Sequence, residues 1–132
     1  MQPKTIKICI LAGEASGDYL GAQLMSSLLK NKHVQIEFIG VGGNLMSSNG
    51  LKSLFPMADL SVMGIAEVIP RLPKLISRIN QTVKYISEQK PDILITIDSP
   101  DFCFRVVRKL KDHKHITKIH YVAPTEWSWR PE

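Results

Sequence analysis

The sequence is poor in cysteine and contains no long apolar run. Its two cysteines, Cys9 and Cys103, lie inside separate apolar stretches and have no metal-ligand spacing, so we predict that both are buried, reduced thiols of a cytoplasmic protein. No stretch is long enough to span a bilayer. The N-terminal segment "MQPKTIKICILAG" is interrupted by Lys7 and is too short for the apolar region of a signal peptide.

Several ligand-binding motifs are also missing. Gly13 and Gly17 fit neither G-x-G-x-x-G nor a Walker A loop, which argues against a dinucleotide or ATP phosphate site. The histidines have no metal-ligand spacing, so we expect no metal; His113 and His115 lie in a lysine-rich segment that we interpret as a solvated turn. No aromatic RNA-binding signature accompanies the dispersed basic residues, and we expect no nucleic acid partner.

What the sequence does contain is a regular alternation of β-branched runs and helical periodicity. Its 132 residues, 44% of them hydrophobic and 22% charged, suit one soluble domain. The alternation predicts an α/β fold with a doubly wound parallel sheet. Strands are expected at 6–12, 36–41, in "PDILITID" and in "KIHYVAP", and helices at 18–30, 74–89 and from about 101. The expected buried stripes are Leu20, Leu24 and Leu28 in the first helix, and Leu75, Ile79, Val83 and Ile86 in the second.

Ligands of doubly wound sheets bind beyond the carboxyl ends of the strands, where the strand order reverses. We therefore expect one cleft to be lined by the residues that follow the strands. These are Gly13, Glu14, Ala15 and Ser16, then Gly42 and Gly43, then Asp98 and Ser99, and finally the segment around Trp127.

Local roles can also explain some of these residues. Gly13 and Gly17 suit an ordinary turn between strand and helix, and Asp18 suits a helix N-terminus. Asp98 could form an Asx turn before Pro100. Glu14 has no capping role at its spacing from the strand, although a surface salt bridge would explain it.

Four motifs identify a known family. "LAGEASGD", "SVMGIAEVI", "KPDILITIDSPDF" and "HYVAPTEWSWRP" occur in the order and spacing typical of lipid-A-disaccharide synthases. The sequence resembles the N-terminal part of that family, whose members are inverting glycosyltransferases of the GT-B fold. The resemblance covers essentially the whole chain, and Ala123 and Glu126 are small departures within the last motif. It implies the transfer of acylated glucosamine from a UDP carrier to acylated glucosamine phosphate, with no metal or other cofactor.

The resemblance also implies roles for particular residues. An inverting displacement needs a base for the attacking hydroxyl, and Asp98 matches that position by its motif. Glu14 is the second candidate for the base, or a group that orients the acceptor.

Residues 1–132 would form a single Rossmann-like, acceptor-side domain. The family's C-terminal domain would hold UDP, so we expect the isolated chain to be inactive unless a partner polypeptide supplies it. The alternatives are a non-catalytic remnant, a binding module that docks on such a polypeptide, or another α/β enzyme.

The stretch "AEVIPRLPKLISRI", residues 66–79, is more apolar than one core-facing stripe requires. Apolar and basic residues alternate in it, and we expect Pro70 and Pro73 to prevent one uninterrupted helix, with helix 74–89 starting after them. Either this is an amphipathic helix entry, or it contacts the inner face of the cytoplasmic membrane. The net charge of +5 favours an anionic lipid surface. The predicted contacts are Val68, Ile69, Arg71, Leu72, Lys74 and Ile76, with Arg78 as a further cation.

Overall fold

The computed structural model describes residues 4–60, 65–98 and 100–121, with backbone only at 65–72, 100 and 101. The strands are β1 (Lys4–Ala12), β2 (Val34–Val41), β3 (Ile93–Ile97) and β4 (Thr117–Tyr121). The helices are α1 (Ala15–Leu29), α2 (Asn44–Ser48), α3 (Ile65–Gln89) and α4 (Pro100–Lys109), and Met57–Leu60 forms the short 3₁₀ helix η1.

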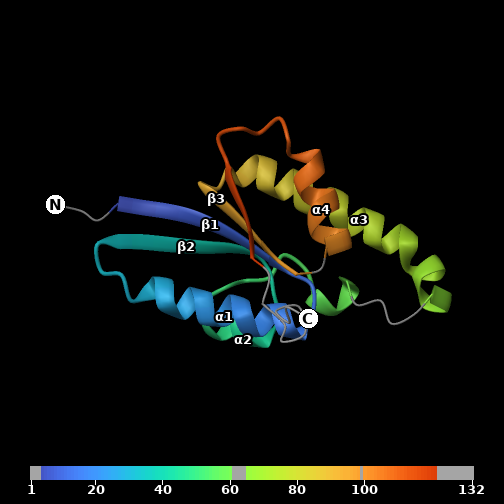
Figure 1. Ribbon diagram of the computed structural model, residues 1–132, viewed down its shortest axis with the longest axis horizontal. Coiled ribbons are helices and arrows are strands. Elements are labelled where there is room, and N and C mark those ends of the chain that lie inside the picture. The colour runs from blue at the N-terminus through green and yellow to red at the C-terminus, as the bar shows by residue number, and fades with distance from the viewer. Residues whose placement is uncertain (1–3, 61–64, 99, 122–132) are drawn as a thin grey trace, which may run out of the picture.

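The four strands form one parallel sheet in the order β2-β1-β3-β4. Figure 1 shows α1 and α2 on one face of this sheet and α3 and α4 on the other. The predicted doubly wound α/β fold is therefore confirmed. The chain runs outward from β1 to β2 and then crosses to β3 on the other side of β1, so the strand order reverses between β1 and β3.

Each face of the sheet has its own core. The α3/α4 face buries Cys9, Leu11, Ile79, Ile86 and Val106, and the α1/α2 face buries Ile8, Ile10, Met25, Ile95 and Ile97. The stripe expected in α3 is confirmed, with Leu75 and Val83 partly buried beside Ile79 and Ile86. Both cysteines are free and buried, as predicted. Burial raises the pKa of Cys103 to about 12 and also raises that of Cys9, so both remain unreactive thiols.

Helix α1 begins at Ala15, three residues before the expected start at Asp18. Its most buried line runs through Gly17, Gly21 and Met25, while the predicted leucine stripe of 20, 24 and 28 packs partly buried beside that line. The small residues explain the shift, because glycine lets the helix backbone approach the sheet more closely than leucine would.

Helix α3 contradicts the expected interruption at its prolines. It continues from Ile65 to Gln89 through Pro70 and Pro73. Proline's φ is itself helical, so each ring removes one N–H donor and crowds the preceding turn without forcing the helix to end.

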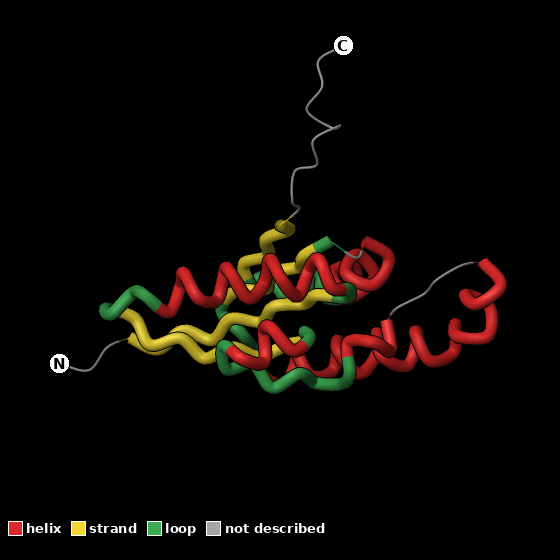
Figure 2. The backbone as a smooth tube through the Cα atoms, turned by 90° about the horizontal axis from the view of Figure 1, so that it is seen from below, coloured by secondary structure: helices red, strands yellow, loops and turns green. Residues whose placement is uncertain are grey.

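The N-terminal end of α3 projects past the sheet in Figure 1, and the view in Figure 2 agrees. No helix in the described part of the chain is long and apolar enough to cross a membrane.

Candidate functional site

The ends of β1 and β3 meet at the point where the strand order reverses. Ala12 pairs with Ile97 in the sheet register, so the segments that begin at Gly13 and Asp98 leave the sheet side by side. Helix α1 starts directly against these two strand ends. A Cβ atom at Gly17 would lie 3.2 Å from the Ala12 Cβ and 3.5 Å from the Ile97 carbonyl oxygen. Gly17 thus has a packing role, and the two candidate acids follow neighbouring strands at the predicted place.

Asp98 has a left-handed backbone conformation, with φ of +47°. Its N–H donates to the Tyr121 carbonyl at 3.3 Å, which ties it to β4. This conformation is uncommon outside glycine and costs of order 1 kcal/mol or more, and such residues cluster at functional sites. The side chain is partly exposed, and its charge contributes to the raised pKa of Cys103. Asp98 thus directly follows β3, and its side chain is partly exposed.

Glu14, Ala15 and Ser16 are all exposed where α1 begins. Glu14 is the N-cap residue of α1 through its backbone, but its side chain makes no capping hydrogen bond. This confirms that the carboxylate has no capping role. The first-turn N–H groups of a helix have no intrahelical partner, and they carry partial positive charge. The start of α1 can therefore bind an anionic or hydroxyl-rich group.

Asp18 has a structural role that its local sequence does not reveal. It is 6% exposed, and its carboxylate accepts hydrogen bonds from the N–H groups of Gly43 at 2.9 Å, Leu45 at 3.0 Å and Met46 at 2.9 Å. These donors form the start of α2, whose N-cap residue Gly43 has no side chain to cap it. Asp18 lies in the first turn of α1, as expected, and its carboxylate also caps the start of α2.

Gly42 and Gly43 lie against this cap. The Gly42 N–H donates to Ser53 Oγ at 3.1 Å, and a Cβ at Gly42 would lie 2.5 Å from the Met46 sulfur. A Cβ at Gly43 would lie 2.7 Å from Asp18 Oδ2. The N–H groups of both glycines are thus used within the fold, and their contact with substrate stays a prediction.

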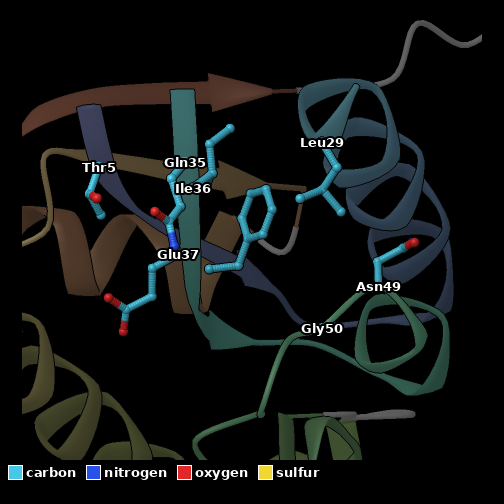
Figure 3. A pocket seen from close by; sticks show the side chains of 8 residues that line it. Thr5, Leu29, Gln35, Ile36, Glu37, Asn49 and Gly50 are labelled. Atoms are coloured by element: carbon cyan, nitrogen blue, oxygen red, sulfur yellow. The ribbon is translucent and has the colours of Figure 1, made fainter. Parts of the chain in front are cut away.

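A hollow of about 640 Å³ opens beside these residues, and we call it the α1–α2 hollow. Its wall includes Ala15 and Asp18 of α1, Leu45 of α2, and Pro56, Met57 and Ala58 at η1. A second hollow of about 450 Å³, the β2-edge hollow, is lined by Thr5, Leu29, Glu37 and Asn49 among others (Figure 3). Of these two hollows in the described part of the chain, the α1–α2 hollow is the one that includes residues of the predicted site, namely Ala15, Gly42 and Gly43.

The histidines show one further difference. His113 is half-buried, with its Nε2 3.1 Å from Ser87 Oγ, which corrects the prediction that it lies in a solvated turn. His120 Nδ1 lies 2.8 Å from Thr96 Oγ1. Among the residues that the structure describes, no three His, Cys, Asp or Glu side chains are grouped to hold a metal ion.

The basic residues of α3 near η1 are engaged by Asp59. Arg78 donates to Asp59 Oδ2 through Nη2 at 2.6 Å and Nε at 3.0 Å, and its guanidinium lies 4.8 Å from the Phe55 ring centre. Lys74 pairs with Asp59 Oδ1 at 3.2 Å but stays 57% exposed. The hydrogen bond from Arg78, with a smaller contribution from Lys74, lowers the pKa of Asp59. Arg78 is therefore not the free lipid-contacting cation that the sequence suggested.

Several predicted site residues lie outside the described parts. These are Ser99, Trp127 and the side chains of Val68, Ile69, Arg71 and Leu72. Ile76 is described, and 47% of it is exposed.

Comparison with known proteins assigns the family. The family model described as lipid-A-disaccharide synthetase matches residues 8–132. This chain belongs to the lipid-A-disaccharide synthetase family. Relatives named lipid-A-disaccharide synthase include one from Rhodospirillum centenum, 50% identical over 97% of this chain and 32% of its own length, and one from Ruegeria pomeroyi, 49% identical over the same shares. The chain thus spans about a third of the length of the curated relatives it matches.

Solved structures support the fold assignment. The S. aureus MnaA–UDP co-structure aligns with a TM-score of 0.60 at 17% identity, covering 96% of this chain and 33% of that one. A UDP-N-acetylglucosamine 2-epimerase from Listeria monocytogenes, described as putative, aligns with a TM-score of 0.57 at 15% identity, covering 97% and 34%. At these identities the likeness shows the shared α/β architecture alone.

Proposed function

We propose that this chain forms the acceptor-side part of a glycosyltransferase of lipid A biosynthesis. The reaction transfers acylated glucosamine from a UDP carrier to a hydroxyl of acylated glucosamine phosphate. The observation that carries the proposal is the juxtaposition of Asp98 and Glu14 after neighbouring strands, in a chain of this family. The UDP-linked donor is bound by parts of the enzyme outside this Rossmann-like segment, whether they belong to the same polypeptide or to a partner.

The proposed chemistry at Asp98 is proton abstraction. As the acceptor oxygen forms its bond to the anomeric carbon, the Asp98 carboxylate takes the hydroxyl proton, and the bond from that carbon to UDP breaks with its electron pair leaving on the phosphate. The exposed Glu14 and the open first turn of α1 hold the acceptor sugar or its phosphate. Glu14 is also the second candidate for the base.

A chimeric enzyme tests the role of the α1 start. This segment replaces the matching third of the Rhodospirillum centenum relative, and Glu14→Ala or Ser16→Ala is introduced. We expect the KM for the acceptor to rise about tenfold or more while the KM for the donor changes little, since these residues contact only the acceptor. Initial rates with each substrate varied in turn measure this effect.

The exposed Ser26→Ala in the middle of α1 is the matched control and should leave both KM values unchanged. A change confined to the donor KM would show that the start of α1 contacts the donor and not the acceptor. An unchanged acceptor KM in both variants would remove these residues from the acceptor site.

We further propose that the projecting end of α3 binds the inner face of the cytoplasmic membrane. The support is its extension beyond the sheet (Figure 1), the exposed Ile76, and the mostly exposed Lys74 near the apolar and basic residues at 68–72. Apolar side chains would enter the headgroup boundary, and basic residues would contribute about 1 kcal/mol each near anionic lipid. This arrangement would bring a cytoplasmic domain to an acylated substrate.

Sedimentation with anionic vesicles tests the membrane proposal. We expect the 132-residue chain to bind them in a salt-sensitive way, and Ile69→Ser with Leu72→Ser to weaken binding more than tenfold, because two apolar side chains no longer enter the lipid. Leu29→Ser, which alters an exposed leucine at the end of α1, should bind like the parent. Far-UV circular dichroism checks that each variant is folded. Equal sedimentation of the folded double variant and the parent would contradict the proposal.

A further inference from the structure

The α1–α2 hollow combines an apolar wall with a place next to the proposed acceptor site. Leu45, Pro56, Met57 and Ala58 contribute apolar surface to it, and Ser47 and other residues contribute polar atoms. Its volume of about 640 Å³ lies within the range of small-molecule sites, which are typically apolar with a few polar groups. Such a lining suits a hydrocarbon chain attached to a polar headgroup.

The exposure of Leu45 is imposed by its neighbours. Its own N–H and that of Met46 donate to the buried Asp18 carboxylate, which holds the start of α2 in place. Met46 is fully buried beneath the helix, in space left free by Gly21 and Gly42. Helix α2 therefore cannot turn Leu45 inward without breaking these contacts, and the side chain stays 47% exposed at the hollow. A single exposed leucine is ordinary, but this one is held in place at the wall of a cavity.

The hollow lies between the start of α1, which we propose binds the acceptor sugar, and the segment that leads to the proposed membrane-binding end of α3. Ala15, the first residue of α1, lies in its wall beside Glu14 and Ser16 in sequence. Its wall also includes Met57 and Ala58 of η1. Because only four residues separate Leu60 from Ile65, the start of α3 lies within roughly 18 Å of Leu60. A chain extending from the headgroup site through the hollow would thus run toward the proposed membrane-binding end of α3.

The β2-edge hollow is the natural competitor, and its lining is less suitable. It also contains an exposed leucine, Leu29, at 48%. However, the Glu37 carboxylate and the Asn49 amide lie in its wall (Figure 3), together with Thr5 near the start of β1. The α1–α2 hollow also has a carboxylate in its wall, but that of Asp18 is buried and accepts three backbone N–H groups, whereas Glu37 is exposed and its charge disfavours an apolar chain or an anionic headgroup nearby. Unlike the α1–α2 hollow, which includes Ala15, Gly42 and Gly43, the β2-edge hollow contains none of the predicted site residues.

We propose that the α1–α2 hollow binds an acyl chain of the acylated glucosamine phosphate acceptor, and that Leu45 is a specificity-determining contact for that chain. The inference rests on the function proposed above. It assigns the hollow a selectivity for acyl length, because each further methylene that fits is removed from water, and one that does not fit gains nothing.

The test uses the 132-residue chain with labelled methyl groups and NMR titration. The probes are glucosamine 1-phosphate without an acyl chain and its N-butanoyl, N-hexanoyl and N-octanoyl derivatives, below their micelle concentrations. We expect saturable shifts of the Leu45 and Met57 methyl signals with the acylated probes only. Affinity should rise roughly fourfold per buried methylene, the fold-change that corresponds to about 0.8 kcal/mol.

Three variants locate the bound chain. Leu45→Gln should weaken binding of the octanoyl probe about tenfold, and Ala58→Trp, which adds a large side chain at another exposed wall position, should do the same. Leu29→Gln is the matched control, since Leu29 is equally exposed but lies in the other hollow, and it should bind like the parent. Backbone amide spectra of each variant verify the fold.

The outcomes separate this inference from the proposed function. Absence of saturable binding, affinity independent of acyl length, or loss of binding in Leu29→Gln rather than Leu45→Gln would overturn the acyl site. Octanoate is an additional probe. If octanoate shifts Leu45 and the glucosamine phosphate adds no affinity, the hydrocarbon site stands while the assignment of the acceptor fails.

Discussion

Asp98→Asn in the chimeric synthase is expected to lower kcat by two or more orders of magnitude while the protein stays folded. Removing a general base typically costs a factor of 10² to 10⁴, because the attacking hydroxyl then has no group to take its proton. Asparagine suits this test because, like aspartate, it tolerates the left-handed conformation that residue 98 adopts at φ +47°. Steady-state rates at saturating acceptor and donor measure the effect.

Two further variants separate the chemistry at Asp98 from its backbone conformation. Asp98→Gly relieves any strain of the left-handed conformation but removes the carboxylate, so it should be as inactive as Asp98→Asn. Asp112→Asn changes an exposed acid in the turn after α4 and should retain full activity. If Asp98→Asn turned over like the parent, Asp98 would not be the base, and Glu14 would become the first candidate.

Asp18→Ala is expected to destabilise the 132-residue chain by about 2 to 4 kcal/mol. The carboxylate is buried and accepts three N–H groups at the start of α2, so its removal leaves these donors without their partner in a poorly solvated position. Hydrogen bonds to charged groups contribute about 1.5 to 3 kcal/mol each, and entry of water would recover part of the loss. Urea denaturation followed by circular dichroism measures the free energy of unfolding.

The control for Asp18 comes from the same loop. Glu14→Ala removes an acid whose side chain is exposed and makes no capping hydrogen bond, and it should change stability by less than about 0.5 kcal/mol. The Asp18→Asn variant should also have a lower free energy of unfolding than the parent, because its side-chain NH₂ group is a donor and would face a backbone N–H donor. If Asp18→Ala were as stable as the parent, the cap of α2 would not depend on this carboxylate. The sequence "GEASGD" would then need another explanation for its second acid.

The contrast between Glu14 and Asp18 shows which parts of the site could be predicted from sequence. Both acids lie in one short motif, and both were open to functional and structural interpretations. The predicted absence of a side-chain capping role for Glu14 is confirmed, although α1 starts earlier than expected and makes Glu14 its N-cap residue. The donors to Asp18 lie 25 to 28 residues further along the chain. No local pattern contains such a contact.

The prolines of α3 show a second limit of local rules. Proline is unfavourable inside a helix by about 3 kcal/mol, which made an interruption the expected result. The helix nevertheless continues from Ile65 to Gln89. Downstream, Ile79 and Ile86 are buried in the sheet core, and Arg78 is held by Asp59 and Phe55. Propensity is a weak tendency when tertiary contacts such as these anchor the rest of the helix.

The amino-acid sequence was sufficient to predict the parallel α/β architecture, the buried cysteines, the family and the placement of Glu14 and Asp98 at the ends of strands. These follow from hydrophobic periodicity and short motifs, which depend on residues close together in the chain. Folding was needed to show that β1 pairs with β3, that Asp18 caps α2, that Arg78 is paired with Asp59, and that Leu45 lines a hollow beside α1. Each of these depends on contacts between segments far apart in sequence, whose distances are set only when the helices pack on the sheet.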